Sequence, residues 1–416
     1  MKIAVWHNLP SGGGKRALYG HIKGLVERGH TVESWCPQTA DQTYLPLSEW
    51  ITEHIIPFKV KTKNRMETLH RKLVGGLDIT DSIEGMEEHS RLCAEQIQQG
   101  GFDVLFANSC HLFASPYIGR YLDMPKVLYL QEPGRYLYEA IPTLRWIAKP
   151  RRPIKRSFQA ARALYKDLRE VQALRIQARE ELTNAQAFDA ILVNSYFSRE
   201  SILRAYGIDA QVCYLGVDAQ VFHGIEEARQ DLVVGIGALE VRKDIGFVID
   251  AVAMTARPHP RLVWIGNSRT PEYLEKLKSH AQNVGVEFEP LVRISDQEMN
   301  DVLSRARMLA YAPYLEPFGF APLEANACGL PVVAVAEGGV RETVQNGVNG
   351  LLVAHEPEAM AAGIDRLRYD PILAHQLGEN GRRLVSEQWS MASSIDRLEH
   401  RLKQAIASRA LASGIS

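Results

Sequence analysis

The run Glu316-Pro-Phe-Gly-Phe-Ala-Pro-Leu-Glu324, continued by Ala-Asn-Ala-Cys-Gly-Leu-Pro-Val-Val-Ala334, carries two carboxylates eight positions apart. Pro317 and Gly319 favour a loop around Glu316, and Pro322 at a first helical position predicts a helix that ends before Gly329. An anion in front of this helix would be stabilised by the unpaired amides at its N-terminus, those of Phe318, Gly319, Phe320 and Ala321. The run therefore predicts two carboxylates and an anion-binding helix end around one small volume.

Two glutamates at this spacing are more often ordinary solvated acids, so the surrounding residues decide between the two interpretations. The whole run resembles the glutamate-x7-glutamate signature of the retaining nucleotide-sugar glycosyltransferases of family 4. Other segments resemble further blocks of that family in the required order, namely residues 214–218 with Phe222, 232–237 followed by Arg242 and Lys243, 337–342, and 346–353. The resemblance covers residues 190–355 and rests on looser patterns before them.

The resemblance implies a GT-B fold, in which two Rossmann-like α/β domains face a central cleft. It also implies a retaining hexosyltransferase that uses a UDP-, GDP- or ADP-linked sugar as substrate and needs no metal or other cofactor. By this likeness Glu316 holds sugar hydroxyls, Glu324 holds the ribose, and Lys243 with Arg242 neutralises the leaving diphosphate. Ala238 stands where many members carry an arginine, so Arg242 is expected to supply that charge. An exposed Arg-Lys pair is otherwise usually a solvated patch.

A glycine loop, His7-Asn-Leu-Pro-Ser-Gly-Gly-Gly-Lys15, follows the first predicted strand. It fits neither the dinucleotide-binding fingerprint nor a P-loop, since Arg16 stands where a P-loop has Ser or Thr. Taken alone the loop is a weak signal. Family likeness makes Gly13 and Gly14 expected neighbours of the donor diphosphate or of the acceptor.

The acceptor side is less regular than the donor side. Many family members carry a histidine on the strand that here reads Val127-Leu-Tyr-Leu-Gln-Glu-Pro133, and Gln131 or Glu132 takes its place. His111 is a second candidate for substrate binding, or else a hydrogen-bonded loop histidine. The expected acceptor is a lipid-linked or cell-surface glycan.

Short β-branched runs alternate with glycine-bearing loops and amphipathic helices, which is typical of parallel α/β sheets. We expect an acceptor-binding domain over residues 1–222, a nucleotide-sugar-binding domain over 223–390, and a C-terminal helix over 391–416 that crosses back to the first domain. Strands are predicted at residues 2–6, 31–36, 102–108, 126–130, 190–194, 232–237, 262–266, 286–289, 308–312 and 331–335, and helices at 15–28 and 389–407. Ser295 and Glu298 predict a capping box.

A basic helical insertion is predicted at about residues 145–182. Residues 145–179 hold eleven Lys or Arg against two acids, and apolar residues fall near one helical stripe. Such a helix suits an anionic membrane surface. A solvated helix that covers the cleft or packs on its own domain is the equally weighted alternative.

Composition sets the remaining limits. A net charge of -1 gives no indication of a nucleic-acid partner, and five scattered cysteines favour reduced thiols in a cytoplasm over disulfides or structural zinc. The N-terminal sequence does not resemble a signal peptide, so we expect a cytoplasmic protein. If the basic helix binds lipid, the protein is expected to be peripheral on the inner face of the membrane. The alternatives are a non-catalytic nucleotide-sugar binder, a sugar phosphorylase and an epimerase.

Overall fold

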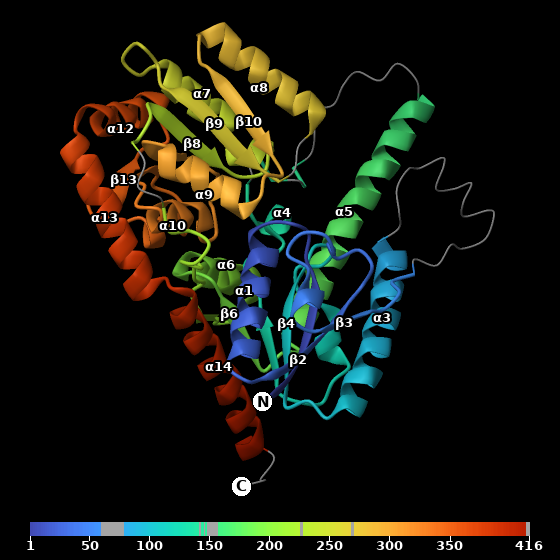
Figure 1. The fold of residues 1–416 in the computed structure, drawn as a ribbon. Helices are drawn as coiled ribbons and strands as arrows, with labels where there is room; N and C mark the ends of the chain where they lie inside the picture. Colours follow the sequence, from blue (N-terminus) through green and yellow to red (C-terminus); the bar gives the residue numbers. More distant parts are fainter. Residues whose placement is uncertain are drawn as a thin grey trace.

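The computed structural model describes residues 1–59, 79–140, 143–144, 146–147, 157–224, 228–267 and 270–412, and it contains two parallel β-sheets (Figure 1). The first sheet has seven strands in the order β3-β2-β1-β4-β5-β6-β7, and the second has six in the order β10-β9-β8-β11-β12-β13. Helices cover both sheets. The predicted fold class, two Rossmann-like α/β domains in a GT-B arrangement, is confirmed.

The strands of the first sheet are β1 (Lys2–Asn8), β2 (Thr31–Cys36), β3 (Thr52–Ile55), β4 (Val104–Cys110), β5 (Lys126–Tyr129), β6 (Ala190–Val193) and β7 (Gln211–Val212). Its helices are α1 (Gly13–Glu27), η1 (Leu47–Glu49), α3 (Ile79–Gly100), η2 (Tyr117–Arg120), α4 (Arg135–Tyr138), α5 (Ser157–Ala185) and α6 (Tyr196–Tyr206). Parallel strands covered on both faces are apolar throughout, and in β1 the four residues from Ile3 to Trp6 are fully buried.

The strands of the second sheet are β8 (Leu232–Ile236), β9 (Arg261–Gly266), β10 (Phe288–Val292), β11 (Met308–Tyr311), β12 (Val332–Val335) and β13 (Gly350–Val353). Its helices are η3 (Val241–Lys243), α7 (Ile245–Ala253), α8 (Pro271–Val284), α9 (Asp296–Arg305), α10 (Phe320–Ala327), α11 (Val340–Thr343), α12 (Pro357–Tyr369) and α13 (Pro371–Gln388). The predicted capping box is confirmed, because Ser295 and Glu298 bond reciprocally at the start of α9.

Three predicted helix starts are wrong by two residues, and one of them is that of α14 (Met391–Ala412), which begins at Met391 and not at Trp389. Helix α1 begins at Gly13 and not at Lys15. Helix α10 begins at Phe320 and not at Pro322, because Gly319 adopts a left-handed conformation (φ 95°) that a side chain would strain, and so ends the preceding loop. Pro322 is consequently the third helical residue, where its missing N–H still costs no hydrogen bond.

The C-terminal helix α14 (Met391–Ala412) lies beside α1 of the first sheet (Figure 1). Gly20 and Gly24 of α1 make this approach possible, since a Cβ at Gly24 would lie 2.6 Å from Ile395. Arg28 at the end of α1 bonds to Glu399 at 3.0 Å. The last helix therefore ties the end of the chain to the first domain.

Helix α5 extends away from the first sheet (Figure 1) and is longer at its C-terminal end than predicted. Its first half is exposed, with Leu164 and Leu168 about 60% accessible (60% and 59%), whereas Glu180, Glu181 and Asn184 in the second half are buried. Residues 145 and 148–156 of the predicted basic segment lie outside the described residues. Within the described ranges, every helix is too short or too polar to span a bilayer.

Candidate functional site

Two loops that follow neighbouring strands bring the central charged pair together. Lys243 follows β8 and Glu316 follows β11, and these strands pair side by side in the sheet. Lys243 Nζ donates to Glu316 Oε2 at 2.7 Å, with side chains only 12% and 18% exposed. Burial by itself raises the pKa of Glu316. The positive charges of Lys243 and Arg242 lower that pKa by more, so that it lies below its ordinary value. Glu316 is therefore held as a carboxylate.

The backbone around Glu316 is fixed by close contacts from both domains. Gly339 N donates to the Glu316 carbonyl at 2.7 Å, and a Cβ at Gly338 would lie 2.4 Å from the same oxygen. From the first domain, Ser195 Oγ donates to Pro317 O at 2.5 Å. Only glycine leaves room for this packing, which explains why Gly338 and Gly339 follow β12.

Glu324 lies on α10 and is 5% exposed. Burial raises its pKa, and among the described residues Arg16 of α1 counters this effect, with its Nε 3.4 Å from Glu324 Oε1. Arg16 also forms two hydrogen bonds to Asp296 of α9, at 2.9 and 2.5 Å. The sequence placed Glu324 at the donor site but gave no sign of this cation from the other domain.

The remaining donor-side candidates lie around this pair. Arg242 is about half exposed (48%) and bonds to Glu240 Oε2 at 3.1 Å, so its guanidinium remains accessible to a ligand. Its carbonyl accepts a hydrogen bond from Tyr314 N. Four residues bound the start of α10: Phe318, Gly319, Phe320 and Ala321. Of these, Phe320 and Ala321 are the first helical residues, and their amides have no partner within α10.

The glycine loop of the first domain faces the second domain. A Cβ at Gly13 would lie 3.6 Å from the Phe320 ring, and a Cβ at Gly14 would lie 3.3 Å from Gln131 Nε2. The structure therefore brings Gly13 to the start of α10 and places Gly14 beside Gln131. The loop lies between the donor-side helix and the candidate acceptor residues.

Glu132 and His111 occupy loops at the carboxyl ends of adjacent strands, β5 and β4. Glu132 Oε2 lies 3.4 Å from Arg135 Nη1, and Arg135 also donates to the carbonyl of Tyr314 in the second domain at 3.3 Å. His111 is exposed, and its Nδ1 lies 3.1 Å from the carbonyl of Asn8. His111 thus has a backbone partner, and its part in substrate binding stays a prediction.

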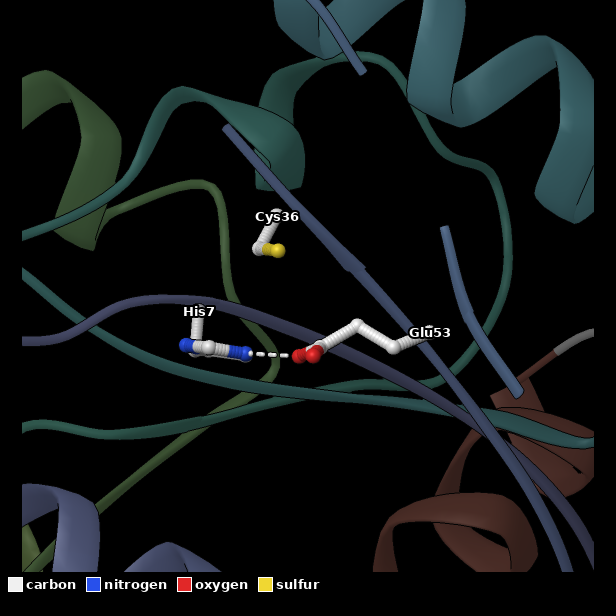
Figure 2. A group of neighbouring side chains, drawn as sticks. All are labelled: His7, Cys36 and Glu53. Atoms are coloured by element: carbon white, nitrogen blue, oxygen red, sulfur yellow. Dashed lines mark hydrogen bonds and ion pairs between the residues drawn. The ribbon is translucent and has the colours of Figure 1, made fainter. Parts of the chain in front are cut away.

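A second polar cluster joins His7 of β1, Cys36 of β2 and Glu53 of β3 (Figure 2). His7 Nε2 lies 2.9 Å from Glu53 Oε1, and Cys36 completes a group whose candidate ligand atoms are all within 4.8 Å of one another. Zinc accepts these three ligand types, but the buried Lys15 opposes a cation there, and His7 Nδ1 has no partner among the described residues. The cluster is better explained as a polar network that supports the loop.

Three residues at the interface were missed in the sequence: Arg16, Arg135 and Glu342. Glu342 accepts from the amides of Tyr196 and Phe197, the first two residues of α6, each at 3.0 Å. A carboxylate at a helix N-terminus is a favourable contact, and this one joins the two domains. Glu342 belongs to the segment 337–342, which resembles a block of the family. No sequence pattern indicated a role for Arg16 or Arg135.

Comparison with known families agrees with this architecture. The profile described as "Glycosyltransferase Family 4" matches residues 11–221, and the one described as "Glycosyl transferases group 1" matches residues 219–384. The first match alone covers half of the chain. The protein belongs to the glycosyltransferases of this family.

Individual relatives are distant. The D-inositol 3-phosphate glycosyltransferase of Corynebacterium jeikeium is 30% identical over 51% of this chain and 56% of its own length. The alpha-maltose-1-phosphate synthase of Mycolicibacterium smegmatis is 29% identical over 48% and 58%. The chain spans little more than half the length of these curated relatives.

Solved structures of similar fold cover nearly the whole chain. Sucrose-phosphate synthase from Thermosynechococcus elongatus superposes with a TM-score of 0.73 at 20% identity, covering 98% of this chain and 100% of its own. Alr3699/HepE of Anabaena, in complex with UDP and glucose, has a TM-score of 0.71 at 19% identity, covering 97% and 99%. At these identities the likeness establishes the fold alone.

Proposed function

We propose that the protein is a retaining hexosyltransferase that moves a sugar from a nucleoside-diphosphate donor to an acceptor bound by the first domain. The observation that carries the proposal is the Lys243–Glu316 pair, a cation and a carboxylate 2.7 Å apart in the loops before α10, which we propose to bind phosphate and sugar respectively. A donor has a diphosphate next to a sugar, so it needs these two groups side by side. Family membership supports the same activity.

Each part of the donor has a complementary group at this site. Lys243, Arg242 and the first amides of α10 supply positive charge for the two phosphates. Glu316 accepts hydrogen bonds from sugar hydroxyls. Glu324 has Oε1 turned to Arg16 and a second oxygen that accepts from the ribose hydroxyls. The UDP and glucose held by the Anabaena protein support a donor of this class.

The proposed chemistry is a front-face displacement. The bond between the anomeric carbon and the phosphate oxygen breaks, and the acceptor oxygen forms its bond to that carbon on the same face, so the configuration is retained. The acceptor proton passes to the departing phosphate oxygen. Negative charge builds on the diphosphate during this step, where Lys243 and Arg242 stabilise it. No metal is required by this account, because side chains and amides balance the charge.

The acceptor is proposed to be a glycan or a lipid-linked glycan, held near Gln131 and Glu132. The exposed part of α5 supports a peripheral site on the inner face of a membrane, because Leu164 and Leu168 are exposed and residues 157–179 hold five Lys or Arg against two acids.

A panel of UDP-, GDP- and ADP-sugars tests the proposal by released nucleotide and by the shift in melting temperature. A transferase releases nucleotide from one donor, and release accelerates when the acceptor is added. A non-catalytic binder, favoured by Ala238 and the absent acceptor-side histidine, would show a thermal shift without release. A phosphorylase would consume a glycan with inorganic phosphate, and an epimerase would convert the donor sugar without transfer.

A further inference from the structure

The second half of α5 contacts both loops of the candidate acceptor side. We define the His111 loop as residues 111–115, after β4, and the Glu132 loop as residues 131–134, after β5. Gln177 donates to the carbonyl of Leu112 at 3.1 Å, and Asn184 donates to that of Ser115 at 2.9 Å. One face of α5 therefore supports the His111 loop.

Glu181 lies between these two contacts and reaches both loops at once. Its Oε1 accepts from Ala114 N at 3.3 Å and from Gln177 Nε2 at 3.1 Å. Its Oε2 accepts from Gly134 N at 3.3 Å and from Tyr206 OH at 2.9 Å. Each oxygen thus holds the backbone of one loop, and the side chain is fully buried.

Gly134 shows independently that this arrangement is tight. A Cβ at Gly134 would lie 2.6 Å from Glu181 Oε2, so only glycine allows the Glu132 loop to approach the carboxylate this closely. Gly134 follows Glu132 and Pro133 and directly precedes Arg135, which donates a hydrogen bond to the second domain. A substitution of Glu181 would therefore displace the loop that carries the candidate acceptor residues.

We propose that Glu181 is a positioning residue for the acceptor, which fixes the His111 loop and the Glu132 loop in one arrangement through its two oxygens. The assignment of these loops to the acceptor rests on the proposed function. The hydrogen bonds themselves do not. Because α5 also carries the exposed basic surface, the same helix connects that surface with the acceptor side.

The protonation of Glu181 makes this arrangement sensitive to pH. Burial raises the pKa of Glu181 to about 7, although hydrogen bonds from Tyr206, Ala114 and Gly134 lower it. The titratable groups that face it are Tyr206 of α6, Tyr138 of α4 and Cys110 of β4, and burial raises the pKa of each, that of Tyr138 to about 12. Glu181 alone therefore titrates near neutrality. A proton on Oε2 would occupy the position that accepts from Gly134.

Amide hydrogen exchange of the full-length protein at pH 6 and pH 8, corrected for intrinsic rates, tests the proposal without knowledge of the acceptor. The amides of Ala114 and Gly134 should be about tenfold better protected at pH 8, the change expected from one hydrogen bond to a charged group. Glu181→Gln should remove the pH dependence, because the side-chain amide of glutamine does not titrate in this range. Glu180→Gln, the neighbour that bonds to Tyr117 and Arg120, is the matched control and should keep it.

Tyr206→Phe provides a second variant if Glu181→Gln does not fold. The Tyr206 hydroxyl lowers the pKa of Glu181, so its removal should move the midpoint of the pH dependence upward. Equal protection of both amides at pH 6 and pH 8 in the wild type, or an unshifted midpoint in Tyr206→Phe, would overturn the proposal.

Nucleotide release separates this inference from the proposed function. Glu181→Gln should raise the KM for the acceptor about tenfold, while acceptor-independent donor hydrolysis stays unchanged. An unchanged acceptor KM would overturn the positioning role. If the wild type releases no nucleotide from any donor, the proposed function fails, and hydrogen exchange still decides whether Glu181 holds the two loops.

Discussion

Lys243 Nζ and Glu316 Oε2 lie 2.7 Å apart, between loops that follow two adjacent strands of the second sheet. Each group compensates the charge of the other in a largely buried position. A donor that inserts its diphosphate beside Lys243 and its sugar beside Glu316 replaces this mutual contact with two ligand contacts. The pair is thus preformed for a ligand that carries a negative group next to hydroxyls.

Replacing Lys243 by methionine should lower kcat by about a hundredfold or more, the usual cost of losing one donor to developing negative charge. Methionine lacks the terminal amino group and keeps the apolar part of the side chain, which packs against Gly237, where a Cβ would lie 3.1 Å from Lys243 Cδ. Steady-state kinetics with varied donor measure the effect. Lys278→Met, at an exposed lysine on α8, is the control and should match the wild type. Wild-type kcat in Lys243→Met would contradict the role in leaving-group stabilisation.

Chelation should leave activity intact. The charges that face the phosphates are proposed to come from Lys243, Arg242 and the amides of α10, so dialysis against EDTA should change kcat by less than about twofold, within ordinary assay scatter. The measurement compares nucleotide release before and after chelation, with magnesium or manganese added back. Complete loss that either ion restores would refute a metal-free mechanism.

Binding to vesicles should increase with anionic lipid and decrease with salt, because α5 exposes Leu164 and Leu168 and the sequence from 145 to 179 holds eleven Lys or Arg against two acids. Sedimentation with neutral and anionic vesicles measures this. The double variant Arg162→Glu/Lys166→Glu should lose most of the binding. Lys276→Glu/Lys278→Glu on α8 changes the net charge by the same amount and should retain it. Equal sedimentation with both lipids would exclude an electrostatic membrane contact.

Replacing Arg16 by glutamine should raise the KM for the donor about tenfold, as expected from the loss of a charged hydrogen bond worth ~1.5 kcal/mol. Arg16 is the cation that opposes the raised pKa of Glu324, so its loss raises that pKa further and protonates the carboxyl more readily. The defect should therefore be larger at pH 6 than at pH 8.5. The control Arg28→Gln breaks contacts to α14 only. A defect that does not vary with pH would show that Arg16 acts otherwise.

Much of the fold could be predicted from the sequence, because fully buried parallel strands leave continuous apolar runs. β2 was predicted at its observed bounds, whereas β3 was missed, since the four residues Thr52–Ile55 contain a single large apolar residue and are partly exposed. A short edge strand has little burial to mark it. The positions of Glu316 and Glu324 around a loop-to-helix junction were predicted from Pro and Gly spacing alone.

The contacts between the domains could not be predicted in this way. Arg16 lies 3.4 Å from Glu324 although the two are far apart in the sequence, and this distance depends on how two separate sheets pack together. The same holds for Arg135 and the carbonyl of Tyr314. Local patterns carry no information about such docking. The role of Glu181 could not be predicted for a related reason. It lies in a segment that the sequence marked only by its many basic residues.

The central claim is that Glu316 and Glu324 bind different parts of one donor, and their alanine variants test it most directly. Glu324 contacts the ribose, which does not change in the reaction, so Glu324→Ala should raise the donor KM more than it lowers kcat. Glu316 orients the sugar at which positive charge develops. Glu316→Ala should therefore lower kcat by roughly tenfold to a thousandfold, if a charged hydrogen bond of about 1.5 to 3 kcal/mol or somewhat more is lost.

The measurement is steady-state kinetics of both variants against varied donor, with circular dichroism to establish that each is folded. The account predicts a kcat defect in Glu316→Ala and a donor KM defect in Glu324→Ala. Wild-type kcat in Glu316→Ala, or unchanged donor kinetics in both folded variants, would contradict the assignment of this motif to the donor site.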